Sequence, residues 1–258
     1  MSPSLLRAYR KKKLYMTNQS TLKGKVAFVT GGTKGIGFGI AQAMLEAGMK
    51  VGITGRSQDK VDQAVSALSA SYGEDKVYGW AADVRDAAAL HRAVADLLAK
   101  TGKLDVVVAN AGVGHFAGIE DLSEADWQET IDVNLTGVFH TVKATLPAVI
   151  AAKGYYITIA SLAGTNFFAG GTAYNASKFG LVGFTQAMMM DLRKHGVKVT
   201  TIMPGSVATE FNDHVPTDAD HWKIQSEDIG QMTVDLLRMH PRTLPSKVEV
   251  RPTMPPGK

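Results

Sequence analysis

The sequence predicts an α/β protein: a single domain built on a doubly wound parallel sheet with helices on both faces. Short apolar runs alternate with longer helical patterns along most of the chain. These runs are continuous rather than alternating with polar residues, which is typical of parallel strands buried on both faces. A glycine-rich turn directly follows the first run. Because such sheets bind ligands beyond the carboxyl ends of their strands, we expect the functional residues there.

The predicted strands are short runs rich in Val, Ile, Thr and other apolar residues. In chain order they cover residues 25–30, 50–54, 77–82, 104–109, 155–160, 197–203 and 247–250. Between them, apolar residues recur at helical spacing. This spacing predicts helices over residues 35–47, 57–72, 86–100, 123–152, 172–195 and 226–239.

The composition limits the classes of protein to which this chain can belong. The chain has 258 residues, 45% of them hydrophobic, which is enough for the core of one α/β domain. It contains no cysteine, which excludes disulfides, thiolate metal ligands and cysteine nucleophiles. No apolar run is long enough to predict a membrane span. The seven histidines lack the spacing of metal ligands, so no metal site is expected.

The net charge of +4 originates at the N-terminus. Residues 1–20 hold five basic and no acidic side chains, so the rest of the chain carries a net charge of −1. This argues against nucleic-acid binding by the folded body. We expect residues 1–21 to form a basic, disordered leader and residues 22–258 to form the domain. A weak targeting segment, or a misassigned start upstream of Met16, are the open alternatives; the leader lacks the apolar core of a secretory signal.

The turn between the first predicted strand and helix indicates a nucleotide site. Its glycines permit a tight turn and a close approach of the backbone to a pyrophosphate, which the helix N-terminus would bind. The spacing is neither that of the GxGxxG motif nor that of a P-loop, and a glycine loop needed only for packing is the alternative. The candidate cofactor-binding residues here are Thr30, Gly31, Thr33, Lys34, Gly35, Ile36 and Gly37.

The residue type at the end of the second predicted strand indicates whether the cofactor is NAD or NADP. An acidic residue there would bind the ribose hydroxyls of NAD, whereas a basic residue would accept the 2′-phosphate of NADP. The chain has Arg56 at this position and no carboxylate before Asp59, while Lys34 adds a second cation. Because a guanidinium matches a phosphate geometrically, the sequence favours NADP(H).

Polar residues also follow the third and fourth strands. Asp83, followed by Val84, can accept a hydrogen bond from an adenine amino group. Asn110, followed by Ala111 and Gly112, can tie neighbouring strands together. Both residue types are also common in turns for purely local reasons.

Tyr174 and Lys178 are four residues apart, so they share one face of the predicted helix. A cation that close favours the tyrosinate and is expected to lower the pKa of the phenol. A tyrosine tuned in this way can exchange a proton with a carbonyl or alcohol oxygen. Ser161 lies thirteen residues upstream. Taken alone, the pair could equally be a solvated surface contact.

Together these residues resemble the classical short-chain dehydrogenase/reductase family, over residues 23–209. Beside the segments already named, the resemblance rests on Asn134 within the sequence VNLTG and on Pro204-Gly205 followed by Thr209. Any one motif is weak, but their order and spacing are those of the family. The resemblance implies a Rossmann fold and an oxidoreductase that uses a nicotinamide cofactor.

The resemblance also implies roles for individual residues. Tyr174 would be the general acid in carbonyl reduction and the base in alcohol oxidation, and Ser161 would hydrogen-bond the substrate oxygen. Lys178 would bind the nicotinamide ribose and lower the pKa of Tyr174, while Asn134 would hold a water that links Lys178 to solvent. The remaining implied cofactor contacts are Pro204, Gly205, Val207 and Thr209.

For the substrate, the resemblance implies a ketone or aldehyde reduced reversibly to an alcohol with NADPH. The core resembles 3-oxoacyl-carrier-protein reductases, whereas residues 244–258 resemble the ending of 3-hydroxy acid dehydrogenases and small carbonyl reductases. Substrates of 3-oxoacyl thioester or 3-hydroxy acid type are therefore candidates. The short segment between Thr209 and Ser226 is predicted to form a small substrate lid.

Two alternatives remain open: an NADP-binding regulatory protein without turnover, and a non-redox reaction such as dehydration or epimerisation on the same fold. The resemblance further implies a homodimer or homotetramer packed through the helices that carry Asn134 and Tyr174. We expect a cytoplasmic protein with a small-molecule substrate, and neither a nucleic-acid nor a membrane partner.

Overall fold

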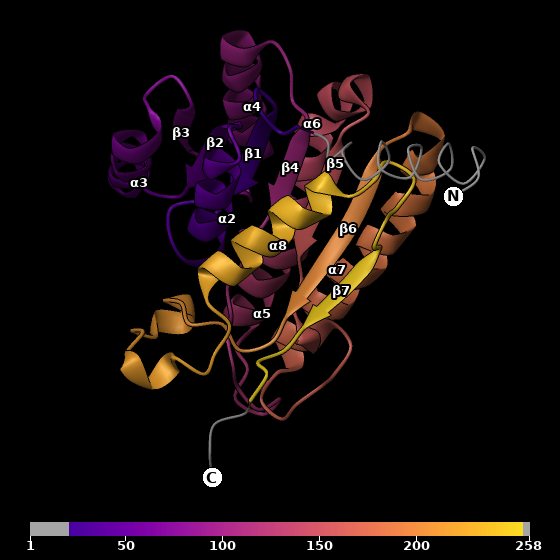
Figure 1. Cartoon of the computed structure of the whole chain (residues 1–258). Coiled ribbons are helices and arrows are strands. Elements are labelled where there is room, and N and C mark those ends of the chain that lie inside the picture. The colour runs from indigo at the N-terminus through magenta and orange to yellow at the C-terminus, as the bar shows by residue number, and fades with distance from the viewer. Residues whose placement is uncertain (1–20, 255–258) are drawn as a thin grey trace, which may run out of the picture.

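A computed structural model describes residues 21–254, so the predicted leader lies almost wholly outside the described residues. Within them, one parallel sheet has the strand order β3-β2-β1-β4-β5-β6-β7 (Figure 1). The strands are β1 (Val26–Thr30), β2 (Lys50–Gly55), β3 (Val77–Ala81), β4 (Val106–Ala109), β5 (Tyr155–Ile159), β6 (Lys198–Pro204) and β7 (Lys247–Val250). The order reverses between β1 and β4, which places the ligand crevice of this architecture at their carboxyl ends.

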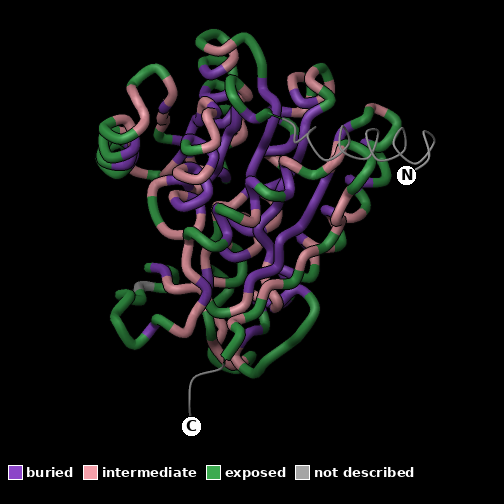
Figure 2. The backbone as a smooth tube through the Cα atoms, in the orientation of Figure 1, coloured by how far each residue is buried: buried purple, intermediate pink, exposed green. Residues whose placement is uncertain are grey.

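Helices cover both faces of the sheet, which confirms the doubly wound prediction. One face carries α2 (Gly35–Glu46), α3 (Gln58–Tyr72) and α8 (Ser226–Arg238). The other carries α4 (Ala87–Thr101), α6 (Gly137–Ala152) and α7 (Thr172–Leu192). The central strands are buried along their length, as the purple tube in Figure 2 shows. Their continuous apolar sequences follow from burial on both faces.

The two core layers meet the sheet from opposite sides because successive strand residues point to opposite faces. Val29 of β1 belongs to the layer under α2 and α8, whereas its neighbour Phe28 belongs to the layer under α4 and α6. Each predicted strand and helix is present, with most ends within two residues of the prediction. The predicted helix over 172–195 ends as α-helix at Leu192 and continues as a 3-10 turn, Arg193–His195.

The long helical region predicted over 123–152 is divided into three parts. It begins as α5 (Glu124–Ile131), widens into a π-helical turn at Asp132–Thr136 and continues as α6. Ser123 caps the start, its hydroxyl accepting from the backbone N–H of Asp126 at 3.1 Å. Single π turns inside α-helices are frequent at functional sites, and this one carries Asn134.

The continuous run 124–152 has the length and mean hydropathy of a membrane-crossing helix, judged by composition alone. Core helices of globular domains pass the same test. Here α6 packs on β4 and α4, and the segment before it packs on α7. This packing is that of a core helix.

Candidate functional site

A groove of about 1070 Å³ crosses the carboxyl ends of the strands. Most of the predicted site residues line it: Gly31, Thr33, Lys34, Gly35, Ile36, Arg56, Asp83, Val84, Asn110, Ala111, Gly112, Ser161, Tyr174, Lys178, Pro204, Gly205, Val207 and Thr209. Three predicted residues do not line the groove and lie next to residues that do: Thr30, Gly37 and Asn134. Residues spread over the whole sequence are therefore brought to one edge of the sheet, as the switch point requires.

The glycine turn after β1 gives the groove a backbone floor. Gly31 and Gly35 have φ angles of 65° and 54°, in the left-handed region that glycine adopts without strain. Gly37 is required because there is no room for a side chain: a Cβ would lie 2.3 Å from the Gly31 carbonyl oxygen and 2.4 Å from Asn110 Nδ2. The first turn of α2 contains no acidic residue and no side-chain cap. Its N–H groups thus suit the phosphates of a dinucleotide.

Asn110 holds the glycine turn against the end of β4. Its Nδ2 donates to the carbonyl oxygens of Thr30 and Gly31, both at 3.0 Å. In return, Thr30 Oγ1 accepts from the backbone N–H groups of Asn110 at 3.1 Å and Ala111 at 3.3 Å. These bonds confirm that Asn110 ties neighbouring strands together, and they explain why Thr30 lies behind the groove.

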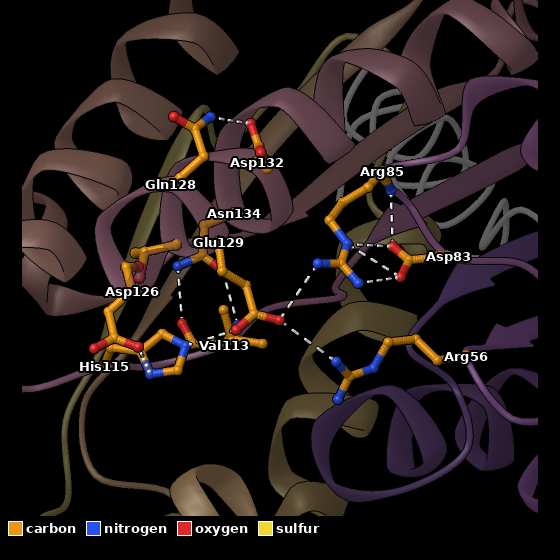
Figure 3. A network of polar contacts seen from close by, with 11 residues as sticks. Arg56, Asp83, Arg85, Val113, His115, Asp126, Gln128, Glu129, Asp132 and Asn134 are labelled. Atoms are coloured by element: carbon orange, nitrogen blue, oxygen red, sulfur yellow. Dashed lines mark hydrogen bonds and ion pairs between the residues drawn. The ribbon is translucent and has the colours of Figure 1, made fainter. Parts of the chain in front are cut away.

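A charged network lies at the predicted adenosine end of the groove (Figure 3). Arg56 Nη1 is 3.6 Å from Glu129 Oε1, and Arg85 Nη1 is 3.5 Å from the same oxygen. His115 Nε2 lies 2.9 Å from the other carboxylate oxygen of Glu129. Glu129 is on α5, whereas the two arginines follow β2 and β3. The sequence interpretation identified Arg56 but missed Glu129 and Arg85, and it assigned no role to His115.

Asp83 is held by Arg85 two residues later. Arg85 Nη2 donates to Asp83 Oδ2 at 2.7 Å, and Nε donates at 3.1 Å to both carboxylate oxygens. These hydrogen bonds hold the pKa of the Asp83 carboxyl below its usual range. The carboxylate is therefore charged at neutral pH, and its remaining acceptor capacity faces the groove.

Ser161, Tyr174 and Lys178 meet at the opposite end of the groove. Ser161 follows β5 and its Oγ accepts from the backbone N–H of Ala163 at 3.1 Å. Lys178 Nζ lies 5.6 Å from the centre of the Tyr174 ring and donates to the carbonyl oxygen of Ile159 at 3.1 Å. The helical spacing of four residues therefore does place the phenol and the ammonium on one side of α7.

The expected lowering of the Tyr174 pKa is not what the structure gives. Burial raises the pKa of the Tyr174 phenol, and the Ser161 hydroxyl acts against this rise. Lys178 is only 4% exposed, and burial lowers the pKa of its ammonium to about 8. Both shifts have one cause, since removal from water penalises each charged form. The sequence argument counted the attraction between the two groups and omitted their shared desolvation.

Asn134 is fully buried in the π-helical turn and fixes the neighbouring loop. Its Oδ1 accepts from the backbone N–H of Val113 at 2.8 Å, and its Nδ2 donates to the Val113 carbonyl at 2.9 Å. Nδ2 also lies 3.0 Å from Ser177 Oγ, next to Lys178 in sequence. The described contacts of Asn134 are thus structural. They position the loop after β4 opposite α7.

Phenylalanine side chains form the part of the groove that the sequence interpretation missed. Phe116, Phe167, Phe168 and Phe211 all line it. Phe116 comes from the loop after β4, the adjacent pair from the loop before α7, and Phe211 from the segment after β6. An adjacent phenylalanine pair in a glycine-rich loop seven and six residues before Tyr174 was the available sequence signal.

The segment between Thr209 and Ser226, for which a lid is predicted, contributes residues to the groove lining. It contains two 3-10 turns, Phe211–Asp213 and Asp218–Asp220. The buried carboxylate of Asp220 organises it: Oδ2 accepts from the backbone N–H of Thr217 at 3.0 Å and contacts His214 Nε2 at 2.7 Å, while Oδ1 pairs with Lys223 Nζ. These partners hold the pKa of Asp220 below its usual range.

Curated relatives are similar to this chain over most of its length. An uncharacterised oxidoreductase of Staphylococcus aureus is 33% identical over 235 residues, covering 90% of this chain and 99% of the relative. A glycine betaine reductase of Emericella nidulans is 33% identical over 227 residues, covering 88% of this chain but 18% of that much longer protein.

Solved structures show the same fold. An alcohol dehydrogenase from Thermococcus sibiricus, complexed with 5-hydroxy-NADP, superposes with a TM-score of 0.84 at 28% identity, covering 91% of this chain and 99% of that one. A metagenomic short-chain oxidoreductase complexed with NADP superposes with a TM-score of 0.78 at 36% identity, covering 91% and 100%. The family model described as short chain dehydrogenase matches residues 25–220. With the fold, the glycine turn and the Ser161, Tyr174 and Lys178 group in place, the chain belongs to the short-chain dehydrogenase/reductase family of oxidoreductases.

Proposed function

We propose that this protein is an NADPH-dependent reductase that converts a ketone or aldehyde reversibly to an alcohol. The observation that carries the proposal is the placement of the Tyr174 phenol beside Lys178 and Ser161, at the end of a groove whose other end holds the glycine turn. The residues fit a dinucleotide, since the glycine turn leaves room for a pyrophosphate and the start of α2 supplies N–H donors.

When bound, NADPH supplies the hydride that the carbonyl carbon accepts. Tyr174 donates its phenolic proton to the carbonyl oxygen, so one carbonyl, one NADPH and one proton give an alcohol and NADP⁺. The raised pKa of Tyr174 keeps the phenol protonated near neutral pH, which suits the role of acid in reduction. Lys178 stabilises the tyrosinate that remains, and Ser161 hydrogen-bonds the substrate oxygen as its charge develops.

The preference for NADP(H) rests on Arg56. It lies at the end of β2 and lines the groove, where its guanidinium can pair with a 2′-phosphate. Lys34 lines the same end and donates to the carbonyl oxygen of Glu210 at 3.2 Å. Two related structures were solved with NADP or its 5-hydroxy derivative. The fold alone does not select the cofactor, because a 3-ketoacyl-(acyl-carrier-protein) reductase from Brucella melitensis, 23% identical, was complexed with NADH.

We also propose a cytoplasmic homodimer or homotetramer. The outward faces of α6 and α7 expose Phe139 and Phe179, which are large apolar side chains that a second copy would cover. A chain without cysteine needs no oxidising compartment for its fold. Light scattering of the purified protein gives the assembly state, and fractionation gives the location.

The test of function is oxidation of NADPH and NADH by the purified protein across a panel of carbonyl compounds. Turnover linked to NADPH supports the reductase. Tight NADPH binding without turnover of any carbonyl supports the regulatory alternative instead. Conversion of a hydroxy compound without net change of the cofactor supports a non-redox reaction.

A further inference from the structure

Two phenylalanine rings pack on the ring of Tyr174 in the groove, and a third packs on one of these two. The Phe116 ring meets it edge-on with centroids 5.3 Å apart, and the Phe211 ring is tilted at 5.9 Å. Phe116 also lies 5.9 Å from Phe168 and 6.5 Å from Phe211. These separations are typical of favourable aromatic pairs. We call Phe116, Phe168 and Phe211 the ring cluster.

The ring cluster is built from three separate segments, and each ring remains accessible. Phe116, Phe168 and Phe211 are 44%, 48% and 37% exposed. Gly114 allows their approach, because a Cβ there would lie 2.6 Å from Phe211 and 3.0 Å from Phe116. Aromatic faces left open beside a reactive hydroxyl gain free energy when a flat apolar group covers them.

The two basic lid residues that line the groove share one acidic partner. His214 and Lys223 are the basic lid residues that line the groove. Lys223 pairs with the buried carboxylate of Asp220, which offsets the lysine charge, and His214 Nε2 contacts the same carboxylate. Glu210 also lines the groove and adds a negative charge. A carboxylate group on the substrate would therefore find no free cation on the lid.

From this arrangement we infer that the substrate is an uncharged carbonyl compound with an aromatic or alicyclic ring next to the reacting carbon, held by Phe116, Phe168 and Phe211. The inference rests on the proposed reductase function and narrows its substrate class. It disfavours the acidic 3-oxo or 3-hydroxy acids suggested by the C-terminal sequence. The ring would pack against the exposed faces of Phe116 and Phe211, which leaves the carbonyl oxygen of the substrate near the Tyr174 and Ser161 hydroxyls.

The kinetic test compares carbonyls that differ only in the ring. With NADPH, 1-phenyl-1,2-propanedione should have a kcat/KM at least about tenfold above that of 2,3-butanedione, and above those of acetoacetate and an acetoacetyl thioester. Phe116→Ala and Phe211→Ala should each raise the KM for the phenyl compound by a larger factor than the KM for butanedione, so that the ratio of the two kcat/KM values falls. Ile119→Ala and Val215→Ala are matched controls, because both residues are exposed in the same two segments and neither lines the groove.

A binding experiment separates this inference from the proposed function. Benzamide is not reducible here, so saturation-transfer NMR with NADP⁺ present should show its ring bound to the wild-type protein. Acetamide should show no transfer, and the Phe116→Ala/Phe211→Ala double variant should lose the benzamide signal. Failure of every carbonyl to turn over, with benzamide still bound, would overturn the reductase proposal alone. Turnover that favours acetoacetate or the thioester, or equal signals for both amides, would overturn the ring-substrate inference.

Discussion

Arg56 Nη1 lies 3.6 Å from Glu129 Oε1, so the cation expected to bind a 2′-phosphate already faces an anion. The pair is loose and solvent-accessible, since Arg56 is largely exposed and no hydrogen bond joins the two side chains. Such pairs contribute little to stability. Glu129 also faces Arg85 at 3.5 Å. The arrangement thus holds two guanidinium groups together at the adenosine end of the groove, at the cost of one opposing charge.

Replacing either member of this pair should change the choice of cofactor. Arg56→Ala should raise the KM for NADPH by about tenfold or more, while the KM for NADH changes little, because only NADPH carries the 2′-phosphate. Glu129→Gln should do the opposite and tighten NADPH binding relative to NADH. It removes the repulsion between the Glu129 carboxylate and the 2′-phosphate of NADPH. Fluorescence titration of both cofactors measures each effect.

Asp126→Asn is the matched control for Glu129→Gln. Asp126 lies on the same helix and contacts His115 at 3.3 Å, but neither of its carboxylate oxygens pairs with an arginine. The Asp126→Asn variant should leave the ratio of the affinities for NADPH and NADH unchanged. Equal changes in the KM for NADPH and the KM for NADH in the Arg56→Ala variant would show that Arg56 does not bind the 2′-phosphate.

Tyr174→Phe should reduce kcat by a factor on the order of 10² to 10⁴, which is the usual contribution of a positioned general acid. The affinity for NADPH should change little, because the change removes one oxygen at the substrate end of the groove. Stopped-flow turnover and a cofactor titration measure the two quantities. Tyr72→Phe is a suitable control, since the hydroxyl of Tyr72 on α3 donates to Glu46 on α2 and neither residue lines the groove. Comparable turnover in the Tyr174 variant would show that another group supplies the proton.

The sequence predicted the architecture because its signals were local. Continuous runs such as the one around Val107 predict buried parallel strands, and Asn110 was expected to join strands because it follows one directly. The glycine turn could be assigned for the same reason. All of its groups are close in sequence to the strand and helix that it connects.

Contacts between residues far apart in the sequence, and the burial of side chains, could not be predicted from such local signals. Glu129 is 73 positions from Arg56, and only the packing of α5 beside the ends of β2 and β3 brings the two charges together. Phe116 and Phe211 meet at Tyr174 from segments that are 95 positions apart. The direction of the Tyr174 pKa shift depends on desolvation, which no spacing of residues reveals.

Lys178 should make stability depend on pH in a defined window. Burial lowers its pKa from 10.5 to about 8 in the folded chain. Below pH 8 both states bind the proton, and the folded state bears the full cost of the buried charge. Between pH 8 and 10.5 only the unfolded state keeps the proton, so the free energy of unfolding rises with pH.

Lys178→Met removes that charge and should stabilise the protein at pH 7. The shift corresponds to on the order of 3 kcal/mol, reduced by about 1 kcal/mol for the lost hydrogen bond to the Ile159 carbonyl. The advantage over wild type should shrink between pH 8 and 10.5 in urea unfolding experiments. Lys143→Met, on the exposed face of α6, should show no such trend. A difference that stays constant with pH would mean that Lys178 titrates alike in both states.

Asp220→Asn should change which substrates the lid accepts. The carboxylate pairs with Lys223 and contacts His214 at the groove, so its neutralisation should leave the Lys223 cation without its anionic partner. The kcat/KM for acetoacetate should then rise several-fold relative to that for 2,3-butanedione, mainly through a lower KM, as expected for a nearby opposite charge. Asp218→Asn is the control, because Asp218 is exposed in the same turn and its side chain pairs with neither basic residue. An unchanged ratio in the Asp220 variant, with NADPH affinity intact, would show that Lys223 and His214 do not reach the bound substrate.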